Sequence, residues 1–213
     1  MDLKQVYEER RSVNFFDTTK TIDRSLLRQI YELARLAPSS WNLQPWKIIV
    51  VSETENKKKL RAAAHGQAKI EEAPLTLIVL GDREGYLYMP VDAQDMAIKG
   101  YIGEDQKERL LSTARDQYSG QAQSEAFALR NAGLFAMSFM YAARYYGVDT
   151  HPMDGFDAPS VRSLFNIPER YIIAMLIAAG YRDTKKTLLS RLDRKDLEQV
   201  CVEEGFLQQA VTR

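Results

Sequence analysis

The chain has 213 residues, of which 45% are hydrophobic, and this suits one globular domain with its own core. Its 29 basic and 29 acidic residues cancel, so the net charge gives no drive toward nucleic acid or an anionic membrane. The single cysteine excludes an intramolecular disulfide. With only two histidines in addition, the chain has few of the side chains that usually bind zinc, so a zinc site is not expected. We therefore expect a single domain over residues 1–213 and no metal.

Targeting and membrane signals are also missing from the sequence. The N-terminal residues lack the apolar core of a signal peptide. The longest apolar tract, near Ala132–Ala143, is too short for a bilayer span and contains Ser138. The expectation is a cytoplasmic protein without a membrane partner.

The first half of the chain alternates helical and extended patterns. Asp23 is a predicted N-cap, because its carboxylate can accept hydrogen bonds from the free N–H groups of a first helical turn. Ser52 and Glu55 have the spacing of a capping box. Here we predict three helices and two buried strands: Leu3–Arg10, Asp23–Leu36 and Glu55–Ala64, then Lys47–Val51 and Leu75–Leu80.

Residues 82–123 have a different composition, with several glycines and interleaved tyrosines. Two short helices are predicted there, near Val91–Lys99 and Asp105–Tyr118. The next segment, Ser124–Tyr146, is apolar on nearly every face, which predicts a long buried central helix of about 35 Å. One subunit of this size does not easily enclose that length, so a dimer interface is the natural partner surface.

The remaining elements complete an α+β domain. Gly147 ends the central helix, and Asp157 is the predicted N-cap of a short helix that ends near Phe165. A strong strand is predicted at Tyr171–Gly180, with further elements near Asp149 and Leu197–Val202. The sheet would then have about five strands, followed by a C-terminal extension over residues 182–213.

Polar side chains gather in the loop between the second predicted helix and the first predicted strand. Pro38 should end the helix, because proline disfavours helical angles in the residue before it. Ser39, Ser40, Asn42 and Gln44 then offer many hydrogen-bond donors and acceptors. Such a loop suits a flat polar ligand, although these side chains can instead satisfy the loop's own backbone.

A basic segment ends the first predicted helix. Arg10 and Arg11 lie beside Ser12 and Asn14. The arginines can complement the helix dipole, or they can form an anion site, since the planar guanidinium suits a phosphate.

Three segments together resemble the signatures of the nitroreductase family of flavin mononucleotide (FMN) enzymes. The first is the Arg-Arg-Ser segment followed by an aromatic residue at 10–16. The second is Pro-Ser-Ser-x-Asn-x-Gln-Pro-Trp at 38–46, and the third is Pro-x-x-Gly-Phe at 152–156. They span most of the chain in the family's order.

The resemblance implies a fold, a cofactor and a reaction. The fold would be nitroreductase-like, a mixed and mainly antiparallel sheet flanked by helices in a homodimer. Noncovalent FMN would carry two electrons from NAD(P)H to nitroaromatics or quinones by a ping-pong mechanism, with no side chain needed as acid or base. The alternatives are an FMN-binding sensor or storage protein without turnover, flavin fragmentation, dehalogenation and heterocycle dehydrogenation. The physiological acceptor and the choice between NADH and NADPH do not follow.

The resemblance also implies which residues contact FMN. Backbone at Asp154 and Gly155 is expected near flavin N5, because glycine permits angles that other residues avoid. Residues 82–123 are expected to form an inserted roof over the active site, where Tyr118 is either a substrate wall or a packed residue. Lys69 can equally be a surface lysine. The expected cofactor-binding residues are Arg10, Arg11, Ser12, Asn14, Pro38, Ser39, Ser40, Asn42, Gln44, Gln67, Lys69, Pro152, Met153, Asp154, Gly155 and Arg191.

Two positions depart from the family's pattern. Asn14 stands where many members carry lysine or arginine. The family has a Lys-x-Arg pair after its last core strand, and here Leu189 replaces the lysine while Arg191 remains. His151 is expected to be structural rather than an acid or base.

Overall fold

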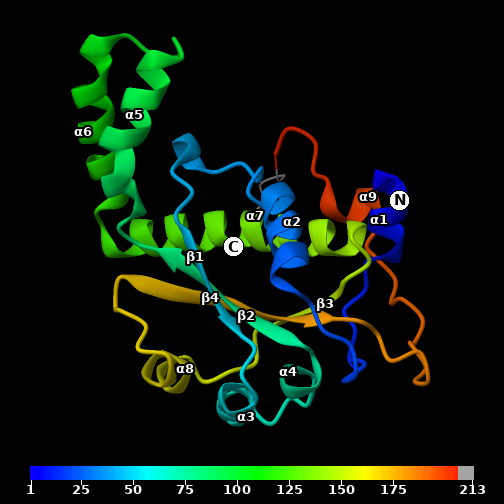
Figure 1. Cartoon of the computed structure of the whole chain (residues 1–213). Coiled ribbons are helices and arrows are strands. Elements are labelled where there is room, and N and C mark those ends of the chain that lie inside the picture. Colours follow the sequence, from blue (N-terminus) through cyan, green and yellow to red (C-terminus); the bar gives the residue numbers. More distant parts are fainter. Residues whose placement is uncertain (206–213) are drawn as a thin grey trace, which may run out of the picture.

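A four-stranded sheet lies at the centre of the computed structural model, which describes residues 1–205 (Figure 1). The strands are β1 (Trp46–Val51), β2 (Leu75–Asp82), β3 (Asp149–Met153) and β4 (Tyr171–Gly180), in the order β1-β2-β4-β3. Every neighbouring pair is antiparallel. The expectation of about five strands with a mixed sheet was therefore wrong: the described residues form four strands without a parallel pair. Residues 206–213, the end of the expected C-terminal extension, lie outside the described part.

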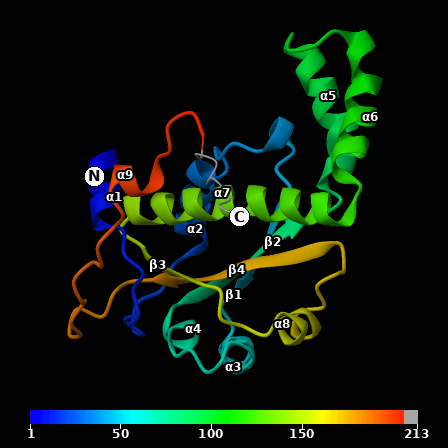
Figure 2. The same cartoon turned by 180° about the vertical axis from the view of Figure 1, so that it is seen from behind.

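Helices cover both faces of the sheet. In Figure 1 and in the reverse view of Figure 2, α2 and α7 lie on one face and α3, α4 and α8 on the other. The helices are α1 (Leu3–Glu9), α2 (Arg24–Ala34), α3 (Thr54–Ala63), α4 (Lys69–Glu72), α5 (Met89–Ile98), α6 (Lys107–Tyr118), α7 (Gln121–Tyr145), α8 (Ala158–Leu164) and α9 (Leu197–Val200). None of the helices in residues 1–205 has the length and hydropathy that crossing a membrane requires.

Two predicted caps are confirmed and one is not. Asp23 accepts a 2.7 Å hydrogen bond from the backbone of Leu26, and Asp157 accepts one of 2.9 Å from Ser160. The expected capping box at Ser52 is absent, because Glu53 is the residue that precedes α3 and it makes no side-chain cap.

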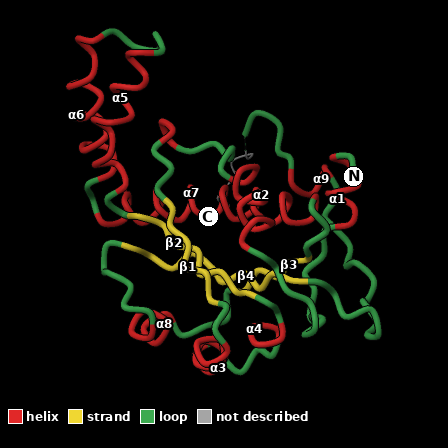
Figure 3. The backbone as a smooth tube through the Cα atoms, in the orientation of Figure 1, coloured by secondary structure: helices red, strands yellow, loops and turns green. Residues whose placement is uncertain are grey.

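The predicted strand near Leu197–Val202 is also wrong. Leu197 instead begins α9, where Asp196 and Gln199 form a capping box that favours a helical turn. Figure 3 shows that the chain between β4 and α9 is loop.

The core forms two layers because β2 is central and buried along its whole length. Leu75, Leu77 and Val79 pack toward α2 and α7, while Ile78 and Leu80 pack toward α3 and α8. This alternation is the period of a strand that is covered on both faces.

Helix α7 approaches the sheet closely at one point. A Cβ placed on Gly81 of β2 would lie 2.6 Å from the carbonyl oxygen of Ala128. Only glycine fits there, so this contact fixes where the helix crosses the strand. Gly147, with φ of +78°, ends α7 in the left-handed conformation that glycine adopts readily.

The expected burial of α7 on all sides holds for only one face of a single chain. Phe135 and Phe139 are buried against the sheet, and Phe127 is buried against the hairpin. Leu129 and Leu134 are 40% and 42% exposed. An apolar face of α7 is thus left open in the isolated chain.

Residues 82–123 form a helical hairpin that projects beyond the two layers (Figure 1). Its base packs into a third cluster, in which Tyr118 is 7% exposed and its ring centroid lies 4.4 Å from that of Phe127. At the root of the hairpin, Arg170 makes two hydrogen bonds, of 3.0 and 2.6 Å, to the carboxylate of Asp82. The ion pair therefore joins the end of β2, at the base of the hairpin, to the residue that precedes β4.

Candidate functional site

A cationic cleft of about 480 Å³ lies between the end of α1 and the chain that follows β4. Four arginines line it, together with the polar side chains of Ser12 and Asn14: Arg10, Arg11, Arg191 and Arg194. The structure thus brings together the basic segment and Arg191, as the sequence predicted, and adds Arg194.

Arginine side chains join the two segments that form the cleft by hydrogen bonds to backbone carbonyls. Arg11 donates from Nη2 to the carbonyl oxygen of Leu189 at 2.7 Å. Arg191 donates to the carbonyls of Glu8 and Arg10 at 2.8 and 3.0 Å. These bonds hold the tail against α1 and leave the positive charges close together.

The charge in the cleft is not neutralised. Burial lowers the pKa of Arg10, and the nearby guanidinium groups of Arg191, Arg194 and Arg11 lower it further. A lowered arginine pKa means that the charged form is penalised, and an anion in the cleft would relieve that penalty. Planar guanidinium donors suit phosphate in particular.

The basic segment runs alongside β3. Ser12 forms a parallel bridge with Thr150, and the Val13 N–H donates to the Thr150 carbonyl at 3.1 Å. His151 Nδ1 lies 3.0 Å from the Val13 carbonyl oxygen. Since a carbonyl can only accept, Nδ1 carries the proton in this contact.

His151 is held neutral by its surroundings. Burial is the main cause that lowers its pKa to about 4, and the charges of Lys69 and Arg10 contribute. With this pKa the ring is neutral at neutral pH, and its contact with the Val13 carbonyl joins β3 to the basic segment. This agrees with the structural interpretation of the sequence.

A chain of hydrogen bonds joins α4 to the segment after β3. Lys69 Nζ donates to Gln67 Oε1 at 3.1 Å, and Gln67 Nε2 donates to the Gly155 carbonyl at 2.8 Å. Burial lowers the pKa of Lys69, so it is not the fully solvated lysine of the alternative interpretation. The structure therefore brings three predicted residues from two segments together.

The expected backbone conformation of Gly155 is not observed. Its φ is outside the left-handed region, and a Cβ there would make ordinary contacts, 3.7 Å from Gln67 Nε2. The glycine leaves space beside an exposed backbone rather than permitting a special angle. Pro152 is partly buried and Asp154 is exposed, whereas Met153 is buried in the core, so only its backbone can face a ligand.

The loop after α2 has a strained backbone, and some of its polar side chains form hydrogen bonds within the loop. Trp41, Asn42 and Gln44 have positive φ values of 51°, 59° and 44°, which are unusual for residues with side chains. Ser39 Oγ accepts from the Gln44 N–H at 3.0 Å, and Gln44 Nε2 donates to the Asn42 carbonyl at 3.2 Å. Ser39 and Gln44 therefore act at least in part on the loop itself, while Pro38 and Asn42 are exposed.

The residue that anchors this loop is Asn131, which sequence reasoning missed. It is 1% exposed within α7 and accepts from the Ser40 N–H at 2.9 Å. Its own amide donates to the Phe127 carbonyl at 2.7 Å. The available signal was an asparagine within an otherwise apolar helix, where a buried amide needs partners.

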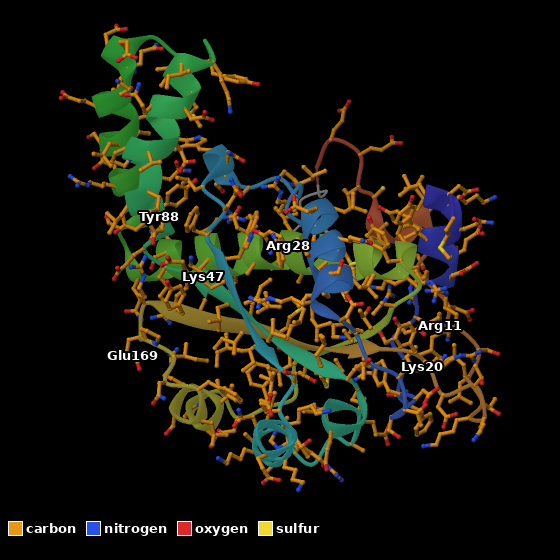
Figure 4. All side chains as sticks on the ribbon, in the orientation of Figure 1. Arg11, Lys20, Arg28, Lys47, Tyr88 and Glu169 are labelled. Carbon is orange, nitrogen blue, oxygen red and sulfur yellow. The ribbon has the colours of Figure 1, made fainter. Side chains whose placement is uncertain are left out.

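Within one chain, the loop contacts the middle of α7, whereas the cationic cleft lies near its C-terminal end. The loop is bonded at Asn131, and Arg10 lies near Tyr141, ten residues or about 15 Å further along the helix. Figure 4 shows Arg11 at one end of the molecule and Tyr88, at the base of the hairpin, at the other. No hydrogen bond in residues 1–205 joins the loop to the basic segment, and no group of three potential metal-ligating side chains occurs there.

Comparison with known proteins assigns the family. The sequence model of the Nitroreductase family matches residues 7–181. A Bacillus subtilis protein with the provisional name NAD(P)H nitroreductase MhqN is 33% identical over 186 residues, 86% of this chain and 90% of that protein. An NADH dehydrogenase of Thermus thermophilus is 34% identical over 181 residues, 85% of this chain and 87% of that protein.

Solved structures agree with this assignment. The crystal structure of ydfN from Bacillus subtilis, provisionally named a nitroreductase, has a TM-score of 0.88 at 32% identity and covers 93% of this chain and 97% of its own. A provisionally named nitroreductase of Exiguobacterium sibiricum, solved in complex with FMN, has a TM-score of 0.80 at 27% identity, over 91% and 94% of the two chains. The chain belongs to the nitroreductase family, which is a family of oxidoreductases, and it has the nitroreductase-like α+β fold.

The neutral state of His151 predicts a pH dependence of stability. Its ring is charged below about pH 6.5 in the unfolded chain but only below about pH 4 in the folded chain. The folded state therefore loses stability as the pH falls from 6.5 to 4, by about 1–2 kcal/mol after allowance for partial exposure. His151→Gln should show a smaller loss over this interval in urea unfolding.

The exposed His65 provides the matched control, since His65→Gln should leave the wild-type pH dependence in place. An equal slope in wild type and His151→Gln would contradict the assignment.

Proposed function

We propose that this protein is an FMN-dependent NAD(P)H oxidoreductase that reduces nitroaromatics or quinones. The observation that carries the proposal is the cationic cleft, whose four arginines match a phosphate and whose Ser12 is bridged to Thr150 of β3. The names of the relatives and the FMN complex of one structural neighbour support it.

The residues of the cleft fit the phosphate of FMN. Arg10, Arg11 and Arg191 would bind its charged oxygens, with Arg194 as a further cation and Ser12 as a hydroxyl donor. Arg191 is already held by two backbone carbonyls, so it can bind without first losing side-chain freedom. Arg194 can offset the lysine that is missing before Arg191.

The ring of FMN would lie against the polar backbone beyond the cleft. Lys69 supplies a positive charge there, which matters because Asn14 is neutral. Gln67 orients the Gly155 carbonyl, so that the backbone at Asp154 and Gly155 can face the ring. His151 of β3 hydrogen-bonds the Val13 carbonyl and so holds the basic segment beside β3, and its neutral ring adds no charge. When bound, FMN would take a hydride from the nicotinamide and pass two electrons to the acceptor.

One pocket would serve both substrates in turn. The sequence has no glycine-rich fingerprint for a separate nicotinamide domain, so donor and acceptor would occupy the same place by a ping-pong mechanism. In a dimer, the α5–α6 hairpin of the partner subunit would cover that place as a roof. Tyr118 would shape the roof from inside rather than line the open pocket, because it is packed against Phe127 and Trp41.

The functional unit would be a homodimer whose two sites each use both chains. The loop and the cleft contact α7 about 15 Å apart, with no hydrogen bond between them in residues 1–205, and the open apolar face of α7 offers the contact surface. The loop residues from Pro38 to Asn42 would then reach the FMN held by the partner subunit's cleft. An interface of this kind would bury more than roughly 2,000 Å².

Turnover tests the function. Purified protein should contain noncovalent FMN, and anaerobic NADH or NADPH should bleach its absorbance at 450 nm, which menadione or a nitrofuran should restore. Double-reciprocal plots should be parallel. FMN that neither nucleotide bleaches would instead support the sensor or storage alternative, and intersecting lines would exclude the ping-pong mechanism.

Removing one arginine tests the phosphate assignment. Arg191→Ala should weaken FMN binding at least tenfold, since one charge-assisted hydrogen bond contributes about 1.5–3 kcal/mol. Flavin fluorescence titration measures this, and the exposed Lys185→Ala in the same tail is the control. Unchanged affinity in Arg191→Ala would refute the assignment.

A charge on the open face of α7 tests the dimer. Leu134→Arg should convert a dimer in light scattering into a monomer and release FMN, because a guanidinium would be buried without a partner at the interface. Leu164→Arg is a matched control, since Leu164 has the same 42% exposure but lies on α8, across the sheet. A wild-type monomer that retains FMN would contradict the two-chain site.

A further inference from the structure

A second cavity, of about 400 Å³, lies between the strained loop and helix α5 of the hairpin. It is separate from the cationic cleft and shares no lining residue with it. Its walls combine three apolar or aromatic side chains, one amide and three charged side chains: Trp41, Met96, Tyr101, Asn42, Asp92, Asp95 and Lys99.

The charges in this cavity do not balance. Asp95 forms a 2.7 Å ion pair with Lys99, which neutralises both. Asp92 forms no hydrogen bond or ion pair with any side chain in the described part of the chain, and it is only partly exposed. Burial, followed by the charge of Asp95, raises the pKa of Asp92. One carboxylate is therefore left in the cavity without a cation.

The aromatic walls favour flat ligands. Trp41 is partly buried, and its ring meets that of Tyr118 edge-on at a centroid distance of 6.2 Å. Tyr101 is 79% exposed on the far side of the opening. Such rings attract other aromatic rings and also cations near their faces. A flat ring with a positive or hydrogen-donating substituent would pack against the aromatic side chains and bind the carboxylate of Asp92.

We propose that Asp92 makes this cavity selective for aromatic acceptors that carry a cationic substituent over acceptors that carry an anionic one. The inference rests on the proposed function, in which Trp41 belongs to the loop that faces the partner subunit's FMN. A cation would pair with Asp92, whereas a carboxylate at the same place would meet like charge. The acceptor range would therefore depend on charge as well as on shape.

Three acceptors that differ at one substituent test the proposal: 4-nitrobenzylamine, 4-nitrobenzyl alcohol and 4-nitrophenylacetate. The FMN-loaded dimer should use the amine with at least tenfold higher kcat/KM than the acetate, the size of one charge-assisted contact. Asp92→Asn should bring the ratio to within about threefold of unity, and Asp92→Lys should invert it.

The matched control is Asp116→Asn, since Asp116 is an exposed carboxylate on α6 of the same hairpin and does not line the cavity. It should retain the wild-type ratio. Equal kcat/KM values for the three acceptors in the wild type would overturn the proposal, as would a ratio that Asp92→Asn leaves unchanged.

A binding measurement separates failure of this inference from failure of the proposed function. Titration of the oxidised holoenzyme without NAD(P)H should quench tryptophan fluorescence at lower concentrations of the amine than of the acetate. Trp41 is the reporter, because the other tryptophan, Trp46, is 7% exposed and stacked on Phe135. Absence of turnover with all acceptors would refute the reductase, and equal quenching by the two ions would still refute the selectivity of Asp92.

Discussion

The close contact between α7 and the sheet determines where every part of the candidate site lies. Gly81 leaves no room for a Cβ beneath the backbone of Ala128, so the helix crosses β2 at one fixed place. From that point Asn131 positions the loop, Tyr141 adjoins Arg10, and the two ends of the helix connect directly to the hairpin and to β3. Helix α7, with 25 residues and a length of about 37 Å, thereby sets the spacing between these parts of the site.

The positive charges of the cleft lie near the C-terminal end of α7. Within residues 1–205, the arginines hydrogen-bond to backbone carbonyls rather than to carboxylates. Arg11 and Arg191 donate to main-chain carbonyls, which position the guanidinium groups without cancelling their charge. Near the other end of α7, an ion pair between Arg170 and Asp82, which is 1% exposed, joins the end of β2 to the residue before β4. A cleft whose cations are not paired with carboxylates can bind a dianion.

Patterns of neighbouring residues predicted much of the secondary structure. They did not predict contacts between segments that are distant in the sequence. The caps at Asp23 and Asp157 and the strand Tyr171–Gly180 follow from neighbouring residues. The family signatures led to Arg10, Arg11 and Arg191, which line the cleft, but not to Arg194. The number of strands was not predicted, because a capping box outweighs the apolar pattern of Leu197–Val202. Asn131 and the Gln67–Gly155 bond could not be foreseen, since each joins segments about 90 residues apart.

The bond between Ser40 and Asn131 has a consequence for the engineering of this enzyme. Ser40 of the loop is encoded 91 residues before the side chain that supports it. A chimera whose crossover falls between these positions would combine one parent's loop with the other parent's anchor, and a buried amide or N–H would lose its partner, at about 1–3 kcal/mol. Libraries that recombine such enzymes should therefore inherit positions 38–46 and 131 as one block.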